Sequence, residues 1–380
     1  MRRRNLIGAA ATLAAPFLTS RAFSDEAGVS ERDVLIGQSA VLSGPLGFAM
    51  KGFNFGAQLA FEQINAQGGV HGRKIRLVSL DDELRPDKTV LNYKKLLAEQ
   101  RVLAFFGGVG SANVAAATPV LQESNAPLIG SYALSDSARA KAAGAAYFVR
   151  AGYGREAERH VQHLTSLGIE RIAVAHLAVR GGEEVLEAVR TAIKAKDPSR
   201  DVVQAIPVKT DGSNAVDAGR AIAAGTAQAV IMFLSGPPVA EVIKTARELG
   251  ANPLFYGMSS VAGEQVAGAL GKRLQGLAIS QVVPFPWNDA DPTARRMAQL
   301  STAAGASVSY YSFEGYINGL LMIEALRRAG RGVTRSTLHS TMRGLKERVG
   351  GMDLDFTAGG HTGSRFVEMV YVTADARFVR

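Results

Sequence analysis

The chain has 380 residues with a formal net charge of +9 at pH 7, and 47% of its residues are hydrophobic. This length suits two domains of about 150 to 200 residues, each able to bury a core. Because the sequence has no cysteine, it can form no disulfide and carries no acylated N-terminal cysteine as an anchor. Lysine and arginine are scattered beside acidic residues through the expected helices, which excludes a concentrated nucleic-acid surface.

The N-terminus has the order of a secretion signal. Three consecutive arginines, residues 2–4, precede an uncharged apolar run at 6–18, and small residues follow. The run is shorter than the roughly 20 residues that cross a bilayer as a helix, so we interpret residues 1–24 as a cleaved leader. Cleavage after Ala22 or Ser24 suits the small-residue rule. The arginines leave the twin-arginine route open beside the Sec route, and we expect the mature protein to be free in the periplasm.

Strand-like apolar runs alternate with helical patterns in both halves of the chain, which is typical of βαβ units and a mainly parallel sheet. In the first half we expect strands at 34–41, 74–80, 102–106 and 127–130 and helices at 56–67, 87–100 and 112–124. In the second half we expect strands at 171–176, 202–208, 229–234 and 254–256 and helices at 156–167, 183–196, 215–224 and 238–249. The run at 229–234 is continuously apolar, as burial on both faces of a sheet requires.

The last part of the chain returns to long helices over residues 295–346, and residues 366–373 have the pattern of a final strand. The helical segment contains apolar residues spaced for one buried face: Leu320, Leu321, Ile323 and Leu326. Two α/β sets followed by helices indicate a chain that crosses between lobes more than once. The predicted fold class is therefore α/β, with two doubly wound lobes. In open α/β sheets ligands bind beyond the carboxyl ends of the strands, so we expect a site between the lobes.

A glycine-rich segment at 107–111 leaves a buried strand and opens a helix. Glycine lets the backbone approach a ligand, while free N–H groups and the helix dipole attract an anion, so a carboxylate is the natural guest. The hydroxyl of Ser111 adds a donor, and a hydrogen bond that involves a charged group contributes about 1.5–3 kcal/mol. A structural turn that merely needs glycine remains the alternative.

Several motifs lie in a specific order along the mature chain. They are Leu-Ser-Gly-Pro at 42–45, Ala-Phe-Glu-Gln-Ile-Asn at 60–65, Gly-Gly-Val-His-Gly-Arg at 68–73, Tyr-Ser-Phe-Glu-Gly-Tyr at 311–316 and Glu-Ala-Leu-Arg-Arg-Ala-Gly at 324–330. With these motifs the chain resembles the leucine/isoleucine/valine-type periplasmic binding proteins of ABC transporters. The resemblance implies the type I fold, in which three crossovers join two doubly wound lobes.

The same resemblance implies a lobe 1 made of residues 25–150 and 284–356, and a lobe 2 made of residues 151–283 and 357–380. It also implies a monomeric binding protein, without a catalytic site or a cofactor, that traps a small ligand by hinge closure. The expected partners are the membrane permease subunits of an ABC transporter. A sensor for a membrane receptor is the alternative in the same fold, and a DNA-binding repressor is excluded because the leader occupies the place of its DNA-binding helices.

The family's site residues carry over to specific positions in the first lobe and at the first crossing. Family members grip the ligand carboxylate from the loop that contains Ser111, and they complete this grip at the next strand exit, where Ser131 and Ala133 lie. Tyr132 either stacks on a ring of the ligand or packs the lobe. Tyr153, at the first lobe crossing, is a further candidate.

The second lobe departs from the family at two positions. Gly181 stands where relatives often have a tyrosine, and Ser259 stands where amino-acid binders place an acid for the ligand's ammonium group. A serine cannot neutralise a buried ammonium, and an uncompensated buried charge costs several kcal/mol. We therefore expect an aromatic or branched acid without an amine. An amino-acid binder with a non-standard amine site stays open, with Glu183 or Glu264 as the substitute acid, as does an anion contact from Arg180.

No reaction centre stands out in the sequence. Gly-Met-Ser-Ser-Val at 257–261 lacks the closing glycine of a nucleophile elbow, and the glycines at 107–110 accompany no phosphate-loop lysine. His160 and His163 share a helix face without a metal-ligand set, so we interpret them as surface histidines. The acids at 81–83 resemble a catalytic cluster, but their position at a strand exit favours a loop-capping role.

Overall fold

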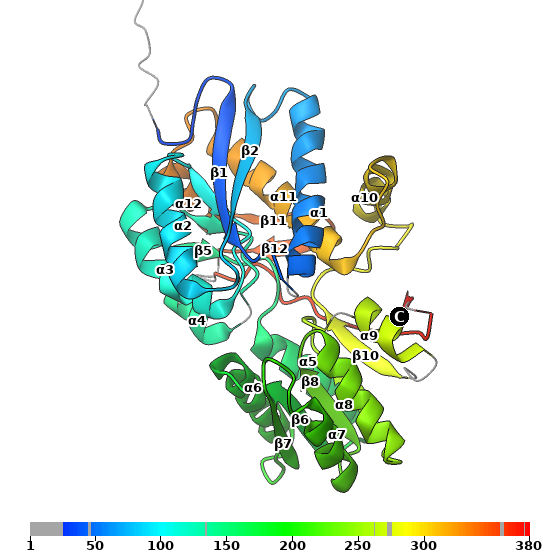
Figure 1. Cartoon of the computed structure of the whole chain (residues 1–380). Coiled ribbons are helices and arrows are strands. Elements are labelled where there is room, and N and C mark those ends of the chain that lie inside the picture. The colour runs from blue at the N-terminus through cyan, green and yellow to red at the C-terminus, as the bar shows by residue number, and fades with distance from the viewer. Residues whose placement is uncertain are drawn as a thin grey trace, which may run out of the picture.

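The computed structural model describes residues 26–44, 47–133, 135–261, 263–271, 276–357, 361–375 and 377–380. The predicted leader, residues 1–24, lies outside this range. Two separate sheets flanked by helices form two lobes, with the first lobe above the second in Figure 1. The α/β class and the two-lobed architecture predicted from the sequence are confirmed.

The first lobe contains a five-stranded sheet with the order β2-β1-β3-β4-β5, and all of its strand pairs are parallel. Its elements are β1 (Asp33–Ala40), α1 (Gly47–Ala66), β2 (Lys74–Asp81), α2 (Pro86–Ala98), β3 (Ala104–Phe106), α3 (Ser111–Ser124), β4 (Leu128–Ile129), α4 (Asp136–Lys141) and β5 (Ala146–Tyr147). The chain winds outward in opposite directions from β1 and β3, so a crevice opens between their carboxyl ends.

The second lobe repeats this winding in a seven-stranded sheet with the order β14-β13-β10-β9-β8-β6-β7. Its elements are α5 (Tyr153–Ser166), β6 (Ile172–Leu177), α6 (Arg180–Lys196), β7 (Gln204–Val208), α7 (Ala215–Ala224), β8 (Ala229–Phe233), α8 (Pro237–Glu248), β9 (Leu254–Gly257), α9 (Gly263–Leu270), β10 (Leu277–Gln281), β13 (Glu368–Val372) and β14 (Phe378–Val379). Strands β6 to β10 pair in parallel, while β13 and β14 extend one edge in antiparallel pairs. The reversal of strand order here falls between β6 and β8.

Strand β8 shows why the parallel strands could be recognised from sequence. Every residue of its Ala-Val-Ile-Met-Phe run is buried. Parallel sheets in α/β proteins carry helices on both faces, so both faces of a central strand must be apolar. The continuous apolar run at 229–234 therefore predicted the correct environment.

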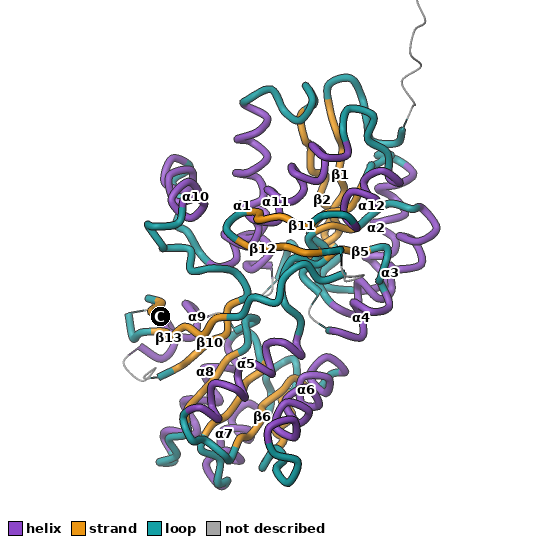
Figure 2. The backbone as a smooth tube through the Cα atoms, turned by 180° about the vertical axis from the view of Figure 1, so that it is seen from behind, coloured by secondary structure: helices purple, strands orange, loops and turns teal. Residues whose placement is uncertain are grey.

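Three late helices and a hairpin follow β10: α10 (Pro292–Ala303), α11 (Tyr310–Ala329), α12 (Arg335–Arg343), β11 (Lys346–Val349) and β12 (Met352–Asp355). Helix α11 packs along α1, so the chain has returned to the first lobe. Figure 2 shows the β11–β12 hairpin on the same lobe. A Cβ atom on Gly56 would lie 1.7 Å from the carbonyl oxygen of Ser312, and one on Gly315 would lie 1.8 Å from that of Phe53. The two backbones approach so closely that only glycine fits at these crossing points.

The expected elements are present with shifted ends, and several short elements were not predicted. Helix α1 begins at Gly47, well before the predicted start at residue 56, because packing against α11 outweighs the low helix propensity of its glycines. The continuous helical segment expected at 295–346 is divided into α10, α11 and α12. Leu320 is only partly buried, although α11 is otherwise buried on most sides. Strand β10, helices α4 and α9 and the β11–β12 hairpin were not predicted from the sequence.

Two segments that run from the first lobe to the second lie side by side. The Phe148 N–H donates to the carbonyl oxygen of His361 at 2.7 Å, and the Ser364 N–H donates to that of Val149 at 3.0 Å. The fully buried guanidinium of Arg139 donates to the carbonyl oxygen of Arg150 at 2.9 Å, and burial lowers its pKa to about 10. None of the described helices is both long and apolar enough to span a membrane.

Candidate functional site

A cavity of about 180 Å³ lies between the lobes, at the carboxyl ends of the strands where both sheets reverse their order. Val41 follows β1 and Val109 follows β3 on the first lobe, while Leu177 ends β6 and Leu234 follows β8 on the second. Each lobe therefore contributes one half of the cavity wall. We call this space the interlobe pocket.

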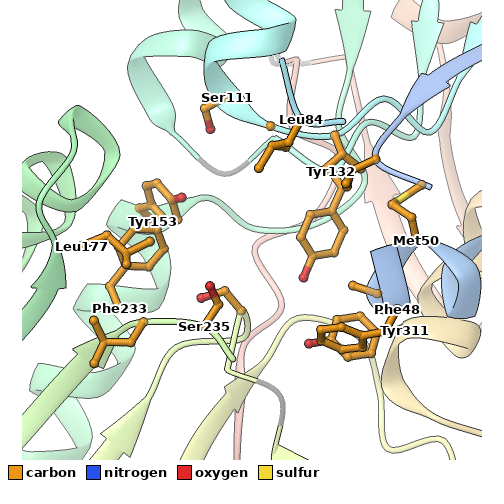
Figure 3. Close-up of a pocket in the computed structure, with 16 residues that line it drawn as sticks. Phe48, Met50, Leu84, Ser111, Tyr132, Tyr153, Leu177, Phe233, Ser235 and Tyr311 are labelled. Carbon is orange, nitrogen blue, oxygen red and sulfur yellow. The ribbon is translucent and has the colours of Figure 1, made fainter. Parts of the chain in front are cut away.

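The lining of the interlobe pocket is apolar and aromatic, with a few hydroxyl groups. Its remaining residues are Phe48, Ala49, Met50, Leu84, Gly110, Ser111, Tyr132, Tyr153, Phe233, Ser235, Ser260 and Tyr311. Figure 3 shows Tyr132 projecting from the first lobe into the space that Tyr153, Phe233 and Ser235 border on the other side. None of the described lining residues has a charged side chain.

Three of the residues proposed from the sequence line this pocket: Ser111, Tyr132 and Tyr153. Helix α3 begins at Ser111, after Gly110 with a φ of 88°, a backbone conformation that favours glycine. The Ser111 hydroxyl oxygen accepts a hydrogen bond from the Ser135 N–H at 3.0 Å, which links α3 to the start of α4. The first turn of α3 therefore faces the pocket from the first lobe.

Two neighbouring candidates lie behind this wall. Ser131 is buried, and its hydroxyl donates to the carbonyl oxygen of Gly108 at 2.8 Å. Ala133 is fully buried, and its carbonyl oxygen accepts from Nε of Arg139 at 2.7 Å. Neither residue is part of the lining of the interlobe pocket.

The two tyrosines at the pocket are held as neutral phenols. Burial raises the pKa of Tyr132 to about 12, and burial also raises the pKa of Tyr153. The ring of Tyr153, the first residue of α5, meets the ring of Phe233 edge-on with centroids 4.8 Å apart. Both tyrosines thus present aromatic surface and a protonated hydroxyl near the cavity.

A buried charged cluster made of Arg150, Glu156 and Glu314 lies behind Tyr132. The Arg150 side chain is 1% exposed, and its Cζ lies 4.0 Å from the ring centroid of Tyr132. Its Nη1 lies 3.3 Å from Oε2 of Glu314 on α11, and its Nη2 lies 3.8 Å from Oε1 of Glu156 on α5. Arg150 therefore pairs with one carboxylate from each lobe, and we call these three residues the Arg150 cluster.

Ser259 belongs to the same network. Its N–H and its hydroxyl each donate to the carboxylate of Glu156 at 2.8 Å, and Nη2 of Arg150 donates to the Ser259 hydroxyl oxygen. The Ser280 hydroxyl also donates to Glu156, at 2.6 Å. The carboxylate that the sequence lacks at position 259 is thus supplied from α5, directly behind the serine, and it is already paired.

Electrostatics keep the Arg150 guanidinium charged. Burial lowers the pKa of Arg150, but Glu314, Tyr132 and Glu156 together raise it by a larger amount, so the net shift is upward. Burial raises the pKa of Glu314, against the opposing effect of Arg150. The carboxylates of Glu156 and Glu314 therefore both interact with Arg150 inside the protein.

No local pattern in the sequence indicates the Arg150 cluster, because its three members come from a crossing segment, α5 and α11. Glu314 does lie in the Tyr-Ser-Phe-Glu-Gly-Tyr motif at 311–316, which was used only as a family marker. Of the acids considered as substitutes for position 259, Glu183 is exposed on α6, and the Glu264 side chain lies outside the described part of the structure. Gly181 lines an adjoining cavity together with Arg180.

One prediction about histidine was wrong, and one about the acids at 81–83 is confirmed. His160 is fully buried, with its Nε2 3.0 Å from the Ser280 hydroxyl, and burial lowers its pKa to about 3. The helix face assigned to solvent packs on the second-lobe sheet instead. Asp81 accepts from the N–H groups of Leu42 and Glu83, so it caps the loop after β2 as expected.

Comparisons with known proteins agree with this architecture. The family model described as periplasmic binding protein matches residues 33–377. A curated relative, an amino acid binding protein of Pseudomonas aeruginosa, is 33% identical over 91 residues. That match covers only 24% of this chain and 24% of the relative's length.

Solved structures match over a much greater length. An extracellular ligand-binding receptor from Verminephrobacter eiseniae has a TM-score of 0.85 at 24% identity, with 92% of this chain and 100% of that chain covered. A substrate-binding periplasmic protein from Ralstonia solanacearum has a TM-score of 0.82 at 26% identity, with 91% and 99% covered.

More distant structures share the fold but are described with different ligands. A branched-chain amino acid ABC transporter protein from Thermus thermophilus contains valine (TM-score 0.80, 18% identity, 92% of this chain and 96% of that chain covered). A solute-binding protein from R. palustris is in complex with 4-hydroxybenzoate (TM-score 0.79, 17% identity, 89% and 92% covered). The family model matches residues 33–377, and the pocket lies where the strand order reverses in both sheets. The chain therefore belongs to the periplasmic binding protein family and has its type I fold.

Proposed function

We propose that the protein is the periplasmic solute-binding component of an ABC uptake transporter, and that it traps a small amine-free organic acid between its lobes. The observation that carries this proposal is a pocket shared by both lobes, whose described lining has no charged side chain, beside two carboxylates that Arg150 already engages. An aromatic or branched acid is the favoured ligand class.

The placement of the pocket supports a closing motion. A ligand that touches both walls binds the closed form more tightly than the open form, and only this difference can drive closure. We place the hinges near Arg150, Pro284 and Phe356. This choice assigns residues 25–150 and 284–356 to lobe 1, and residues 151–283 and 357–380 to lobe 2.

The first turn of α3 supports a carboxylate as the anionic group. Backbone N–H groups at the start of a helix carry a partial positive charge, and Ser111 adds a hydroxyl at the same point. The apolar and aromatic lining then suits the body of the acid, because ligand pockets combine apolar walls with a few placed polar groups. Ser131 and Ala133 support this wall from behind through their hydrogen bonds.

The Arg150 cluster supports an amine-free ligand. A buried ammonium needs a carboxylate partner, since an uncompensated charge costs several kcal/mol. Glu156 accepts from Ser259 and Ser280, and Glu314 pairs with Arg150, so neither carboxylate faces the interlobe pocket without a partner of its own. The ligands named for relatives of this fold include both an amino acid and an aromatic acid, so the fold itself allows either class.

The proposed partners and location follow from the family. We propose delivery of the ligand by a monomer to membrane permease subunits, after export through the Sec or twin-arginine route. A sensor role would require a membrane receptor as the partner. Loss of ligand-dependent uptake on deletion of the gene supports transport, whereas retained uptake with lost ligand-induced signalling supports the sensor.

The decisive test compares ligands that differ only in the amine. Isothermal titration of the mature protein with leucine and with 4-methylpentanoate, its amine-free counterpart, is extended to 4-hydroxybenzoate and octanoate. We expect at least one acid to bind and leucine not to bind. Micromolar binding of leucine would overturn the amine-free class and favour an amino-acid binder with a non-standard amine site. Mass spectrometry of ligand retained from the natural host identifies the acid directly.

A further inference from the structure

A second cavity, of about 450 Å³, opens beside the interlobe pocket, and Ser111 lines both. Its walls come from α3 and α4 of the first lobe and from the start of α6 of the second. The side chains that matter for its chemistry are Ser111, Ser135, Lys141, Arg180 and Glu184. We call this space the outer cavity; unlike the interlobe pocket, it has charged walls.

Two cations face the outer cavity from opposite lobes. Lys141 is the last residue of α4, and Arg180 is the first residue of α6. Both side chains are exposed, and neither has a hydrogen-bond or ion-pair partner among the described residues. Other surface arginines, such as Arg155 and Arg200, are paired with acids.

The position of Arg180 has no local explanation. The start of a helix carries the positive end of the helix dipole, so a cation there is destabilising by a few tenths of a kcal/mol. Glu184, one turn later on α6, also lines the cavity, and its Oε2 is buried without a hydrogen-bond partner in the described structure. The outer cavity thus combines two unpaired cations with a single carboxylate, a charge balance that favours an anionic guest.

We propose that Lys141 and Arg180 clamp the carboxylate of the ligand at the mouth of the interlobe pocket, one cation from each lobe. This inference rests on the proposed function. The ligand then lies with its apolar body toward Tyr132 and Phe233 and its anionic end at Ser111, facing outward. The substrate class is an acid with a compact apolar body and one terminal carboxylate.

The clamp also makes closure depend on the ligand's charge. Without an anion, closing the lobes holds two cations in one cavity, and their repulsion opposes closure. A carboxylate between them reverses the sign of the interaction, so the acid gains affinity specifically in the closed form. A neutral analogue with the same body fills the interlobe pocket but provides no such gain.

The experiment compares an acid with its neutral amide. Titrations with 4-hydroxybenzoate and 4-hydroxybenzamide, and with octanoate and octanamide, are carried out on the wild-type protein and on the double variant Lys141→Met/Arg180→Met. The matched control is Lys94→Met/Lys196→Met, which removes the same net charge from exposed lysines on α2 and at the far end of α6. Small-angle scattering follows the radius of gyration as a measure of closure.

We expect the clamp variant to lose acid affinity at least about tenfold, the control to stay within about twofold, and amide affinity to change little. Acid, but not amide, should reduce the radius of gyration of the wild type. Unchanged acid affinity in a clamp variant that unfolds at the wild-type temperature would overturn the clamp while leaving the proposed function intact. If the wild type binds neither acid but binds leucine, the proposed ligand class fails, and the clamp fails with it.

Discussion

The guanidinium of Arg150 lies over the ring of Tyr132, with its Cζ 4.0 Å from the ring centroid. One side of Tyr132 faces the interlobe pocket, so this contact connects the pocket wall to the charges at the lobe crossing. A cation over an aromatic face contributes on the order of 2 kcal/mol when desolvated. The position of the Tyr132 ring is therefore set from behind by a residue that does not touch the pocket.

Replacing Arg150 should destabilise the protein strongly. Arg150→Met leaves Glu156 and Glu314 as buried carboxylates without their cation, and breaking a buried pair costs about 3–5 kcal/mol. Urea denaturation measures the loss in the free energy of unfolding. The control is Arg155→Met, which removes a partly exposed arginine paired with Glu158 at 3.0 Å and should cost under about 1 kcal/mol. Equal costs for the two variants would contradict the structural role of the Arg150 cluster.

Two adjacent glycines should respond oppositely to alanine. A Cβ on Gly181 would lie 3.9 Å from the Tyr153 hydroxyl oxygen, which is ordinary contact, whereas a Cβ on Gly182 would lie 1.9 Å from the carbonyl oxygen of Leu177. Gly181→Ala should therefore be neutral or stabilising by up to about 1 kcal/mol, and Gly182→Ala should be destabilising. Thermal unfolding of the pair checks this order. A stable Gly182→Ala protein would show that α6 can move away from β6.

The Ser111 hydroxyl should matter for acids. Ser111→Ala removes a hydroxyl at the start of α3, and we expect the affinity for 4-methylpentanoate or 4-hydroxybenzoate to fall about ten- to hundredfold, the range expected for one hydrogen bond to a charged group. Titration calorimetry measures this loss. Ser199→Ala, an exposed serine outside both cavities, is the control and should bind as the wild type does. Unchanged affinity in Ser111→Ala would refute the carboxylate grip.

Glu368 should make the stability fall as the pH rises. Burial raises the pKa of Glu368 to about 7, against the opposing effect of Arg380, and its Oε1 has no hydrogen-bond partner in the described structure. Between the ordinary pKa of a glutamate and pH 7 the folded state holds a proton that the unfolded state has lost, so stability declines over this window. Above pH 7 the full penalty of the buried charge is present.

Glu368→Gln removes this penalty. Its melting temperature should exceed that of the wild type at pH 8 and approach it near pH 4, and differential scanning calorimetry at several pH values tests this. The exposed Glu123→Gln on α3 is the control and should show no such pH-dependent difference. A Glu368→Gln gain that is the same at pH 4 and pH 8 would exclude titration of Glu368 as the cause.

Much of the fold was readable from local patterns. Continuous apolar runs such as 229–234 marked the buried parallel strands, and glycine-rich exits such as 107–111 marked the loops at the carboxyl ends. Short elements such as β10 and the β11–β12 hairpin carry too few residues for a periodic pattern. Helix α1 began earlier than predicted because its glycines pack against α11, a contact between segments more than 200 residues apart.

The candidate site, like the fold, was only partly predictable from local patterns in the sequence. Ser111 was predicted from its glycine-rich strand exit and, like Tyr132 and Tyr153, from the resemblance to the family, and all three line the interlobe pocket. His160 was assigned to the surface because a helical pattern alone does not say which face meets the sheet. The sequence correctly shows no acid at position 259. The fold nevertheless places the carboxylate of Glu156, on α5, within hydrogen-bond distance of Ser259.

By itself, the sequence determined the α/β class, the two-lobed architecture and strand exits that line the interlobe pocket, because apolar periodicity and glycine placement act over a few residues. Only the tertiary structure decided which charges meet. Arg150, Glu156 and Glu314 are brought together by a lobe crossing, α5 and α11, and Lys141 and Arg180 are brought to one cavity by α4 and α6. Electrostatic interactions depend on distance in space, and distance along the chain does not set it.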